Sequence, residues 1–121
     1  MSLEMDLSKT GYEMFFKPYQ VHALRYLWTA ESGAISREVW EQVNKRLEGS
    51  ISRASIINSL NDMADNGILD YEEATGKGGR HRIYRHRYSE TELREHLAAV
   101  FIGKLLKEFP EETRRVVETS Q

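Results

Sequence analysis

Five positively charged side chains lie close together in the segment from Thr75 to Tyr88, TGKGGRHRIYRHRY, which contains no carboxylate. Lysine and arginine at this density can hold phosphate groups, because both side chains stay charged near neutral pH and offer only hydrogen-bond donors. Glu72 and Glu73 could instead pair across this segment with Arg82 or Arg85, as a surface ladder worth only tenths of a kcal/mol per pair. Two acids cannot neutralise five cations. The segment therefore indicates phosphate contact, above all through Lys77 and Arg80.

The chain as a whole is nevertheless acidic, since 17 Lys and Arg stand against 19 Asp and Glu and the formal net charge is -2. The 121 residues suffice for one small domain with an appended element. There is no cysteine, which excludes disulfides, thiolate nucleophiles and cysteine-based zinc sites. No apolar run approaches the roughly 20 residues of a membrane span, and the acidic start does not resemble a secretory signal. We therefore expect a cytoplasmic protein without a membrane partner.

The sequence has none of the motifs that would indicate catalysis. Its GKGG segment does not fit the phosphate-binding loop G-x-x-x-x-G-K-[ST], because the glycines join two predicted strands rather than opening a helix. His81 and His86 point to opposite faces of a predicted strand, and His22 and His96 fall on separate helices, so none has metal-ligand spacing. No G-x-S-x-G segment presents a serine nucleophile. We expect neither enzymatic activity nor a metal or other cofactor.

The elements around these residues follow from the spacing of apolar side chains. Residues 1–17 have no sustained period and predict a loose arm that docks near its end. Helical spacing predicts helices from Pro18 to about Ala30, from an N-cap at Ser36 to Leu47, and from an N-cap at Ser52 to the turn at 66–67. The second and third helices, joined by a short glycine-containing turn, form a helix-turn-helix unit.

Beyond the third helix the apolar period changes to two, which predicts a β-hairpin. Its strands are expected at 68–73 and 80–88, with a glycine-rich turn at 75–79. Alternation along the second strand places Arg82 on the same face as Tyr84. The positive charge is therefore spread over the turn and both faces of the hairpin.

The C-terminal part predicts two more helices. Ser89-Glu90-Thr91-Glu92 matches a capping box that begins a long helix, and Pro110 begins a short one. The long helix has an apolar stripe that a small domain has little core left to cover, which favours burial in a twofold partner. The alternative is that this helix folds back onto the first helix of its own chain. The stripe proposed as the dimer interface is Leu93, Leu97, Val100, Phe101, Leu105 and Phe109.

Three helices followed by a hairpin with a basic tip are typical of a winged helix-turn-helix, in which the third helix enters the major groove of DNA. We therefore predict a mainly α fold with a small β-hairpin: an N-terminal arm at 1–17, a winged-helix DNA-binding domain at 18–88 and a C-terminal helical dimerisation segment at 89–121. The helix at 52–66 would read the groove and the wing at 75–82 would lie on the backbone. The predicted DNA-contacting residues are Ser52, Arg53, Ser55, Asn58, Ser59, Lys77, Arg80 and Arg82.

Four stretches carry a family resemblance: LRYLW, SREVWEQV, SIINSLNDMADNGIL and GRHRIYRHRYSETE. In order and spacing, over about residues 18–109, they resemble the penicillinase-repressor (BlaI/MecI) family of winged-helix regulators. The resemblance implies a homodimeric transcriptional repressor that binds a pseudo-palindromic double-stranded DNA operator. It also implies that Ser55 and Asn58 face the groove and that Arg80 is the wing arginine.

The chain departs from this family at two places. Asp62 stands where the family often has a basic residue, so the resemblance implies no phosphate contact there. The family's resistance repressors are cleaved at an Asn-Phe bond, where this chain has Val100-Phe101. The resemblance therefore does not extend to induction by proteolysis or to antibiotic resistance.

Two further functions remain open from the sequence. One is a winged helix that contacts other proteins in a larger assembly without binding DNA, and the other is a regulator that responds to an effector of unknown chemistry. DNA binding through about 4–8 phosphates per dimer should weaken steeply as salt is raised, whereas protein contacts through acidic surfaces should not strengthen at low salt. Salt dependence therefore distinguishes the DNA-binding protein from the protein-binding one.

Overall fold

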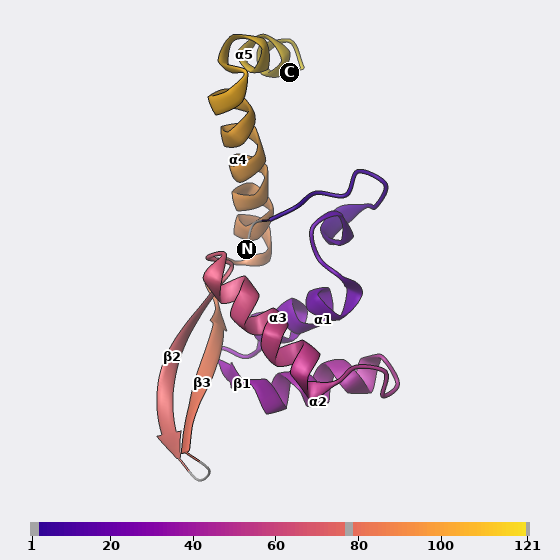
Figure 1. Cartoon of the computed structure of the whole chain (residues 1–121), viewed down its shortest axis with the longest axis vertical. Coiled ribbons are helices and arrows are strands. Elements are labelled where there is room, and N and C mark those ends of the chain that lie inside the picture. The colour runs from indigo at the N-terminus through magenta and orange to yellow at the C-terminus, as the bar shows by residue number, and fades with distance from the viewer. Residues whose placement is uncertain (1–2, 77–78, 121) are drawn as a thin grey trace. The chain divides into compact units, whose positions relative to one another are not determined.

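The computed structural model describes residues 3–76 and 79–120, and its helices and strands follow the order of a winged helix (Figure 1). These residues fall into two compact units, Met1–Arg87 and Tyr88–Gln121. The elements of the first unit are the 3-10 helix η1 (Gly11–Met14), α1 (Pro18–Thr29), β1 (Ala34–Ile35), α2 (Ser36–Arg46), α3 (Arg53–Asp65), β2 (Leu69–Gly76) and β3 (Gly79–His86). The second unit consists of α4 (Glu90–Glu108) and α5 (Pro110–Thr119). The fold is mainly helical with one small sheet, as the sequence predicts.

The core of the first unit is formed by apolar side chains from α1, α2, α3 and the sheet. Each fully buried aliphatic side chain stabilises the fold by about 1.5–3 kcal/mol relative to an exposed one. The largest fully buried side chains of this unit are Leu24, Leu27, Val39, Val43, Ile56, Leu60, Ile68 and Leu69. Those that lie on α1, α2 and α3 recur at the helical spacing seen in the sequence, so the three predicted helices are confirmed.

The sheet has three antiparallel strands in the order β1-β3-β2, with β3 in the middle (Figure 1). The predicted hairpin is confirmed, but its strands run closer to the tip, because the pairing continues to Gly76 opposite Gly79. β1 is a third strand, which is not predicted from the sequence because it consists of only two residues. It pairs through Ala34 with Tyr84, about fifty residues further along the chain.

Gly33 allows β1 to approach β3 this closely. Its φ is +84°, a left-handed conformation that favours glycine. A Cβ atom at this position would lie 2.7 Å from Cγ2 of Ile83 and 2.9 Å from the carbonyl oxygen of Tyr84. A larger residue would therefore separate the two strands.

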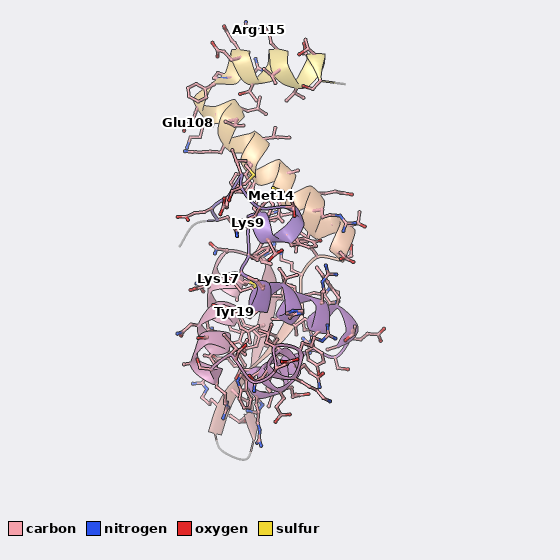
Figure 2. All side chains as sticks on the ribbon, turned by 90° about the vertical axis from the view of Figure 1, so that its right-hand side faces the viewer. Lys9, Met14, Lys17, Tyr19, Glu108 and Arg115 are labelled. Carbon is pink, nitrogen blue, oxygen red and sulfur yellow. The ribbon has the colours of Figure 1, made fainter. Side chains whose placement is uncertain are left out.

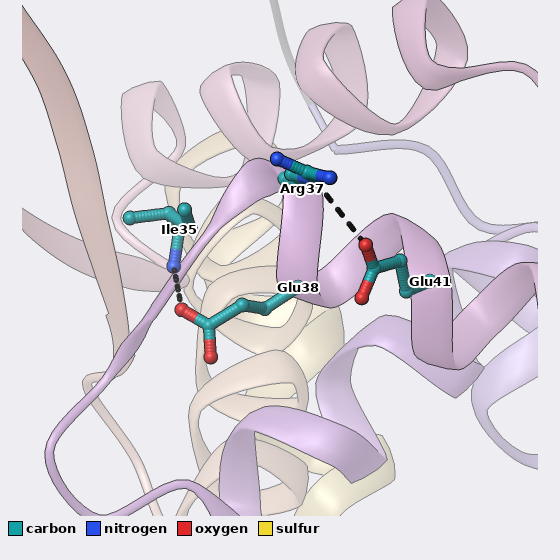
Figure 3. Close-up of polar contacts among 4 residues, drawn as sticks. All are labelled: Ile35, Arg37, Glu38 and Glu41. Carbon is teal, nitrogen blue, oxygen red and sulfur yellow. Dashed lines mark hydrogen bonds and ion pairs between the residues drawn. The ribbon is translucent and has the colours of Figure 1, made fainter. Parts of the chain in front are cut away.

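The start of α2 differs from the prediction by one residue. Ser36 is the first helical residue rather than the N-cap, so the capping role predicted for its side chain is wrong. Ile35 takes the N-cap position in extended conformation because its pairing with Ile83 in the sheet runs directly into the helix. Glu38 compensates for the missing cap, since its carboxylate accepts a hydrogen bond from the Ile35 N–H at 3.4 Å (Figure 3). Arg37 and Glu41 form an ion pair one turn along the same helix.

The turn between α2 and α3 is fixed by two side chains of α2. Trp40 donates its indole N–H to the carbonyl oxygen of Ile51 at 2.9 Å, and Asn44 accepts from the Ile51 N–H at 3.2 Å. Ser52 then caps α3 as predicted, because its hydroxyl accepts from the Ser55 N–H at 3.1 Å. The start of α3 is therefore held firmly against α2.

The N-terminal arm is more ordered than the sequence indicates. The Asp6 N–H donates to the carbonyl oxygen of Met14 at 2.7 Å, which folds the arm back on itself. Hydrogen bonds from Ser8 to the Asp6 carboxylate also lower the pKa of Asp6. Figure 2 shows Met14, Lys17 and Tyr19 as the chain passes from η1 into α1. Phe16 is buried, so the arm docks near its end as expected.

The second unit begins with the predicted capping box. The Ser89 hydroxyl accepts from the Glu92 N–H at 3.1 Å, and the Glu92 carboxylate accepts from the Ser89 N–H at 2.9 Å. Thr113 of α5 donates its hydroxyl proton to the Leu105 carbonyl oxygen of α4 at 3.1 Å. Within the described ranges, no helix is both long and apolar enough to cross a bilayer.

Candidate nucleic-acid interface

The outward face of α3 is defined by the residues that it does not bury. Ile56, Ser59, Leu60 and Met63 form its buried side. At 100° per residue the opposite side is a strip of four residues, which are Ala54, Asn58, Asn61 and Asp65. Ala54, Asn58 and Asp65 are exposed and Asn61 is half-buried. Small amides and a methyl group make a face that can lie close to the base edges in a groove.

Ser59 does not belong to this face, so its predicted place among the DNA-contacting residues is wrong. It is only 4% exposed. Its hydroxyl donates to the Tyr19 hydroxyl at 3.2 Å and accepts from the Gln20 amide at 3.3 Å. Two polar partners on α1 satisfy the buried hydroxyl and connect α1 to α3.

The other predicted residues of α3 lie near its N-terminus. Ser52 and Arg53 are exposed, and Ser55 is half-buried. The Ser52 hydroxyl is used by the cap, and it also donates to the Ser55 hydroxyl at 2.9 Å. The Arg53 guanidinium lies 6.0 Å from the centroid of the Trp40 ring, a weak cation–π contact that leaves the charge accessible.

Charge is distributed unevenly along α3. Arg53 lies in the first turn, where the helix dipole is also positive. Asp62 and Asp65 lie in the last turns and would repel phosphate groups. The geometry therefore favours docking on a polyanion through the N-terminal two thirds of the helix.

The hairpin is joined to α3 by a cluster of four side chains. The Arg82 guanidinium donates through Nη1 to Oδ1 of Asn61 at 2.9 Å, and the Tyr84 hydroxyl donates to the same oxygen at 2.6 Å. Arg82 also lies over the Tyr71 ring, with 4.1 Å between Cζ and the ring centroid. Tyr84 is 3% exposed, and its burial raises the pKa of its hydroxyl, while the positive charge of Arg82 works in the opposite direction. This cluster fixes the wing relative to α3.

The register of the hairpin shows which cations share a face. Thr75 opposes Arg80, Glu73 opposes Arg82 and Tyr71 opposes Tyr84, so these residues point to one side of the sheet. Arg82 and Tyr84 contact α3, and their shared face, which the sequence predicts, is confirmed. Arg80 is therefore on the α3 side of the wing.

Carboxylates of β2 pair with two of the wing arginines. Arg80 contacts Glu73 at 2.6 Å, and Arg85 contacts Glu72 at 2.5 Å on the opposite face. The surface ladder considered from the sequence is thus present, although Glu73 pairs with Arg80 rather than with Arg82 or Arg85. Lys77, predicted at the tip of the wing, lies outside the described residues.

A groove of about 1260 Å³ runs beside the exposed strip of α3, on the side away from the wing. Its walls are the arm with the start of α1 on one side, and Ser55, Asn58 and Asp62 of α3 on the other. The exposed strip of α3 is therefore bordered by the groove on one side and by the wing on the other.

The predicted apolar stripe of α4 divides into two parts. Leu93 and Leu97 are buried and Phe101 is half-buried, whereas Val100, Leu105 and Phe109 are exposed. Three further exposed apolar residues lie outside the predicted stripe, Ile102 on α4 and Val116 and Val117 on α5. At 100° per residue, Val100 lies on the opposite side of the helix from Ile102, Leu105 and Phe109, which fall within about 60° of one another. We call these three exposed residues the apolar patch: Ile102, Leu105 and Phe109.

Sequence reasoning missed two residues of the candidate interface, Asn61 and Tyr71. Asn61 follows Asn58 by three residues, so the helical period alone could have placed it on the exposed face. Tyr71 had no such signal, because its contact with Arg82 depends on the register of the hairpin. Among the described side chains there is no group of three or more His, Asp or Glu residues that could hold a metal ion.

Comparisons with known proteins give few matches. No protein-family model matches the chain, and no curated protein is significantly similar to it. Among solved structures, the chain is similar to the crystal structure of the PcaV transcriptional regulator from Streptomyces coelicolor in complex with its natural ligand. The identity is 23%, the TM-score is 0.47, and the match covers 88% of this chain and 77% of that chain. The winged-helix architecture itself rests on the order and register of the elements described above.

Proposed function

We propose that this protein is a transcriptional regulator that binds double-stranded DNA, with α3 in the major groove and the wing on the neighbouring backbone. The observation that carries the proposal is the Arg82–Asn61 hydrogen bond. It holds a cationic strand beside the outward-facing amides of Asn58 and Asn61 on α3, so that one surface offers both hydrogen-bonding groups for base edges and positive charge for phosphates. Arg53, Arg80 and Arg82 supply the positive charge.

We further propose that the protein acts as a homodimer on a pseudo-palindromic operator. The apolar patch of the second unit supports this, because large apolar side chains exposed on one side of a helix usually mark an interface. The predicted interface residues Leu93 and Leu97 are already buried in the single chain, so the exposed part of the stripe is the better candidate surface. Twofold symmetry of the protein would require half-sites about one helical turn, or a multiple of it, apart.

The regulator is proposed to be a repressor, on the basis of the resemblance to the penicillinase-repressor family. Such a protein would act in the cytoplasm, where the operator lies. A wing seated on the backbone and a helix in the groove would exclude other proteins from the same stretch of DNA.

The proposal is tested by titrating the purified protein onto a pool of random-sequence duplexes at two salt concentrations, then sequencing the retained DNA. We expect retention that falls with salt at a slope of about -0.9 per phosphate contact and enrichment of an inverted repeat. Absence of retention at low salt would reject DNA binding. It would favour the protein-contact module instead, which the pairing of Arg80 and Arg85 with β2 carboxylates also supports.

Three substitutions separate the roles of α3 and the wing. Arg80→Ala should weaken binding to all duplexes similarly and reduce the salt slope by about 0.9. Arg85→Ala is the matched control, because it removes the same charge from the opposite face of the same strand. Asn58→Ala should weaken the selected site more than random DNA, and equal losses on both would remove Asn58 from base recognition.

A further inference from the structure

We infer that Asn61 contacts a base edge in the major groove as a hydrogen-bond donor only, and that Arg82 and Tyr84 impose this orientation. The inference rests on the proposed DNA binding and adds to it the chemistry of one recognised base. It assigns guanine or thymine, whose major-groove edges carry oxygen acceptors, to the position facing Asn61.

The orientation of the Asn61 amide follows from the chemistry of its partners. A guanidinium has five N–H donors and no acceptor, so the Asn61 atom that faces Arg82 Nη1 at 2.9 Å must be the oxygen. Tyr84 donates to the same atom at 2.6 Å. An amide oxygen has two lone pairs, and both are occupied here. Asn61 therefore has no acceptor left for a ligand.

The two donors that fix Asn61 are themselves held in place. Tyr84 is buried in the middle strand of the sheet, opposite Tyr71. Arg82 lies over the Tyr71 ring at 4.1 Å, which restricts the guanidinium. Turning the amide over would place its NH₂ group against a guanidinium and leave the Arg82 donor without an acceptor, which is unfavourable.

The amide nitrogen of Asn61 is left open. It makes no hydrogen bond within the part of the chain that the structure describes. In that part of the chain, two buried side-chain N or O atoms lack a hydrogen-bond partner, and they are Nδ1 of His22 and Nδ1 of His86. Since Nδ2 of Asn61 also lacks a partner but is not one of these two, it is not fully buried and is accessible to solvent. Asn61 lies on the exposed strip of α3, one turn beyond Asn58. Its two N–H donors are thus available on the face proposed to enter the groove.

A donor-only amide recognises different bases from a free one. A free asparagine binds adenine through two bonds, donating to N7 and accepting from N6. Asn61 cannot accept, so the second of these bonds cannot form. Its NH₂ group suits the O6 and N7 acceptors of guanine or the O4 acceptor of thymine. At adenine it keeps one bond, to N7, beside the N6 donor, and at cytosine it faces the N4 donor alone. Asn58, whose amide makes no hydrogen bond in the described structure, keeps both groups for adenine.

The test compares operator selection by the wild type, Asn61→Asp and Asn58→Asp, with each variant's fold confirmed by circular dichroism. Asp at position 61 keeps an oxygen for Arg82 and Tyr84, so the cluster and the fold are retained, but the outward NH₂ becomes an acceptor. At one operator position we expect the wild type to prefer guanine or thymine and Asn61→Asp to prefer cytosine or adenine. Each protein should bind its preferred class of bases about 10-fold more tightly than the other class. Asn58→Asp is the control, because it introduces the same charge on the same strip and should alter a different position.

The outcomes separate this inference from the proposed function. If the wild type retains no duplex, DNA binding is rejected, and the role of Asn61 is rejected with it. If the wild type selects an operator and Asn61→Asp selects the same bases at every position, the role of Asn61 alone is overturned. Selection of cytosine by the wild type at the position sensitive to Asn61→Asp would also overturn it, because cytosine offers this amide only a donor.

Discussion

Glu73 and Arg80 form an ion pair across the wing, with 2.6 Å between Oε2 and Nη2. Both side chains are well exposed, at 47% and 76%, so the pair itself contributes little to stability. Its effect on the proposed phosphate contact is larger, because a carboxylate beside the guanidinium competes with an incoming phosphate and repels it.

Glu73→Gln should therefore raise affinity for duplex DNA about two- to five-fold at low salt, by releasing Arg80 and removing a negative charge from the docking face. Fluorescence anisotropy with a labelled duplex measures this. Glu72→Gln is the matched control, because Glu72 is the neighbouring residue but pairs with Arg85 on the other face. Equal gains in both variants would show that net charge alone, rather than the Arg80 contact, sets the affinity.

Ser59→Ala should destabilise the fold by about 1 kcal/mol, because the hydroxyl is buried and hydrogen-bonded to Tyr19 and Gln20. Urea unfolding measures the loss. DNA affinity of the folded variant should not change, since the side chain is not on the exposed strip. A drop in affinity without a drop in stability would return Ser59 to the candidate interface.

Gly33→Ala should destabilise the first unit by about 2–4 kcal/mol, the sum of left-handed strain and overpacking against β3. Gly49→Ala separates these two terms, because Gly49 has a similar φ of +81° but no atom within 4 Å of the position that a Cβ would take. The loss expected there is about 1 kcal/mol. If the two variants unfold at the same urea concentration, the close approach of β1 to β3 is not what requires glycine at position 33.

Ionisation of the Tyr84 hydroxyl should lower the free energy of unfolding at alkaline pH. Its pKa is raised by burial above the ordinary value of 10.0, so above that value the unfolded chain loses its proton before the folded one does. The stabilisation is complete below pH 10.0 and is lost as pH rises through the higher folded pKa. Tyr84→Phe should show a shallower loss of melting temperature over this window. An unchanged slope would mean that other groups cause the alkaline loss.

Leu105→Glu should weaken the proposed homodimer at least about ten-fold, because a carboxylate buried in an apolar interface lacks a partner. Sedimentation velocity over a range of protein concentrations reports the change. Lys107→Glu, an exposed polar position on the same helix, should leave association nearly unchanged. A wild type that stays monomeric at all concentrations would reject the homodimer and leave the apolar patch for another partner.

The features that the sequence predicted well are those with local causes. The capping hydroxyls of Ser52 and Ser89 act on residues three positions away, and Gly67 ends α3 with a φ of +75°. The alternation that placed Arg82 beside Tyr84 is likewise a property of a single strand. The helices, the hairpin and the predicted face of Arg82 follow from such short-range rules.

The errors arise where a distant partner decides the outcome. Ser59 is polar and is predicted to contact DNA, but Tyr19 and Gln20, about forty residues earlier, make its burial favourable. Ser36 is not the N-cap of α2, because Ile35, which pairs with Ile83 in the sheet, takes that position. No periodicity within one helix contains this information.

β1 contributes only two residues, yet its pairing with β3 has a consequence for how the chain folds. The paired residues Ala34 and Tyr84 are about fifty positions apart, whereas the helices between them depend on local contacts. Contacts between such distant residues form late, because closing the intervening loop costs chain entropy. During translation, the pairing of β1 with β3 cannot form until Tyr84 has been synthesised. The helix-turn-helix can thus form early in synthesis, while its alignment with the wing belongs to a later step.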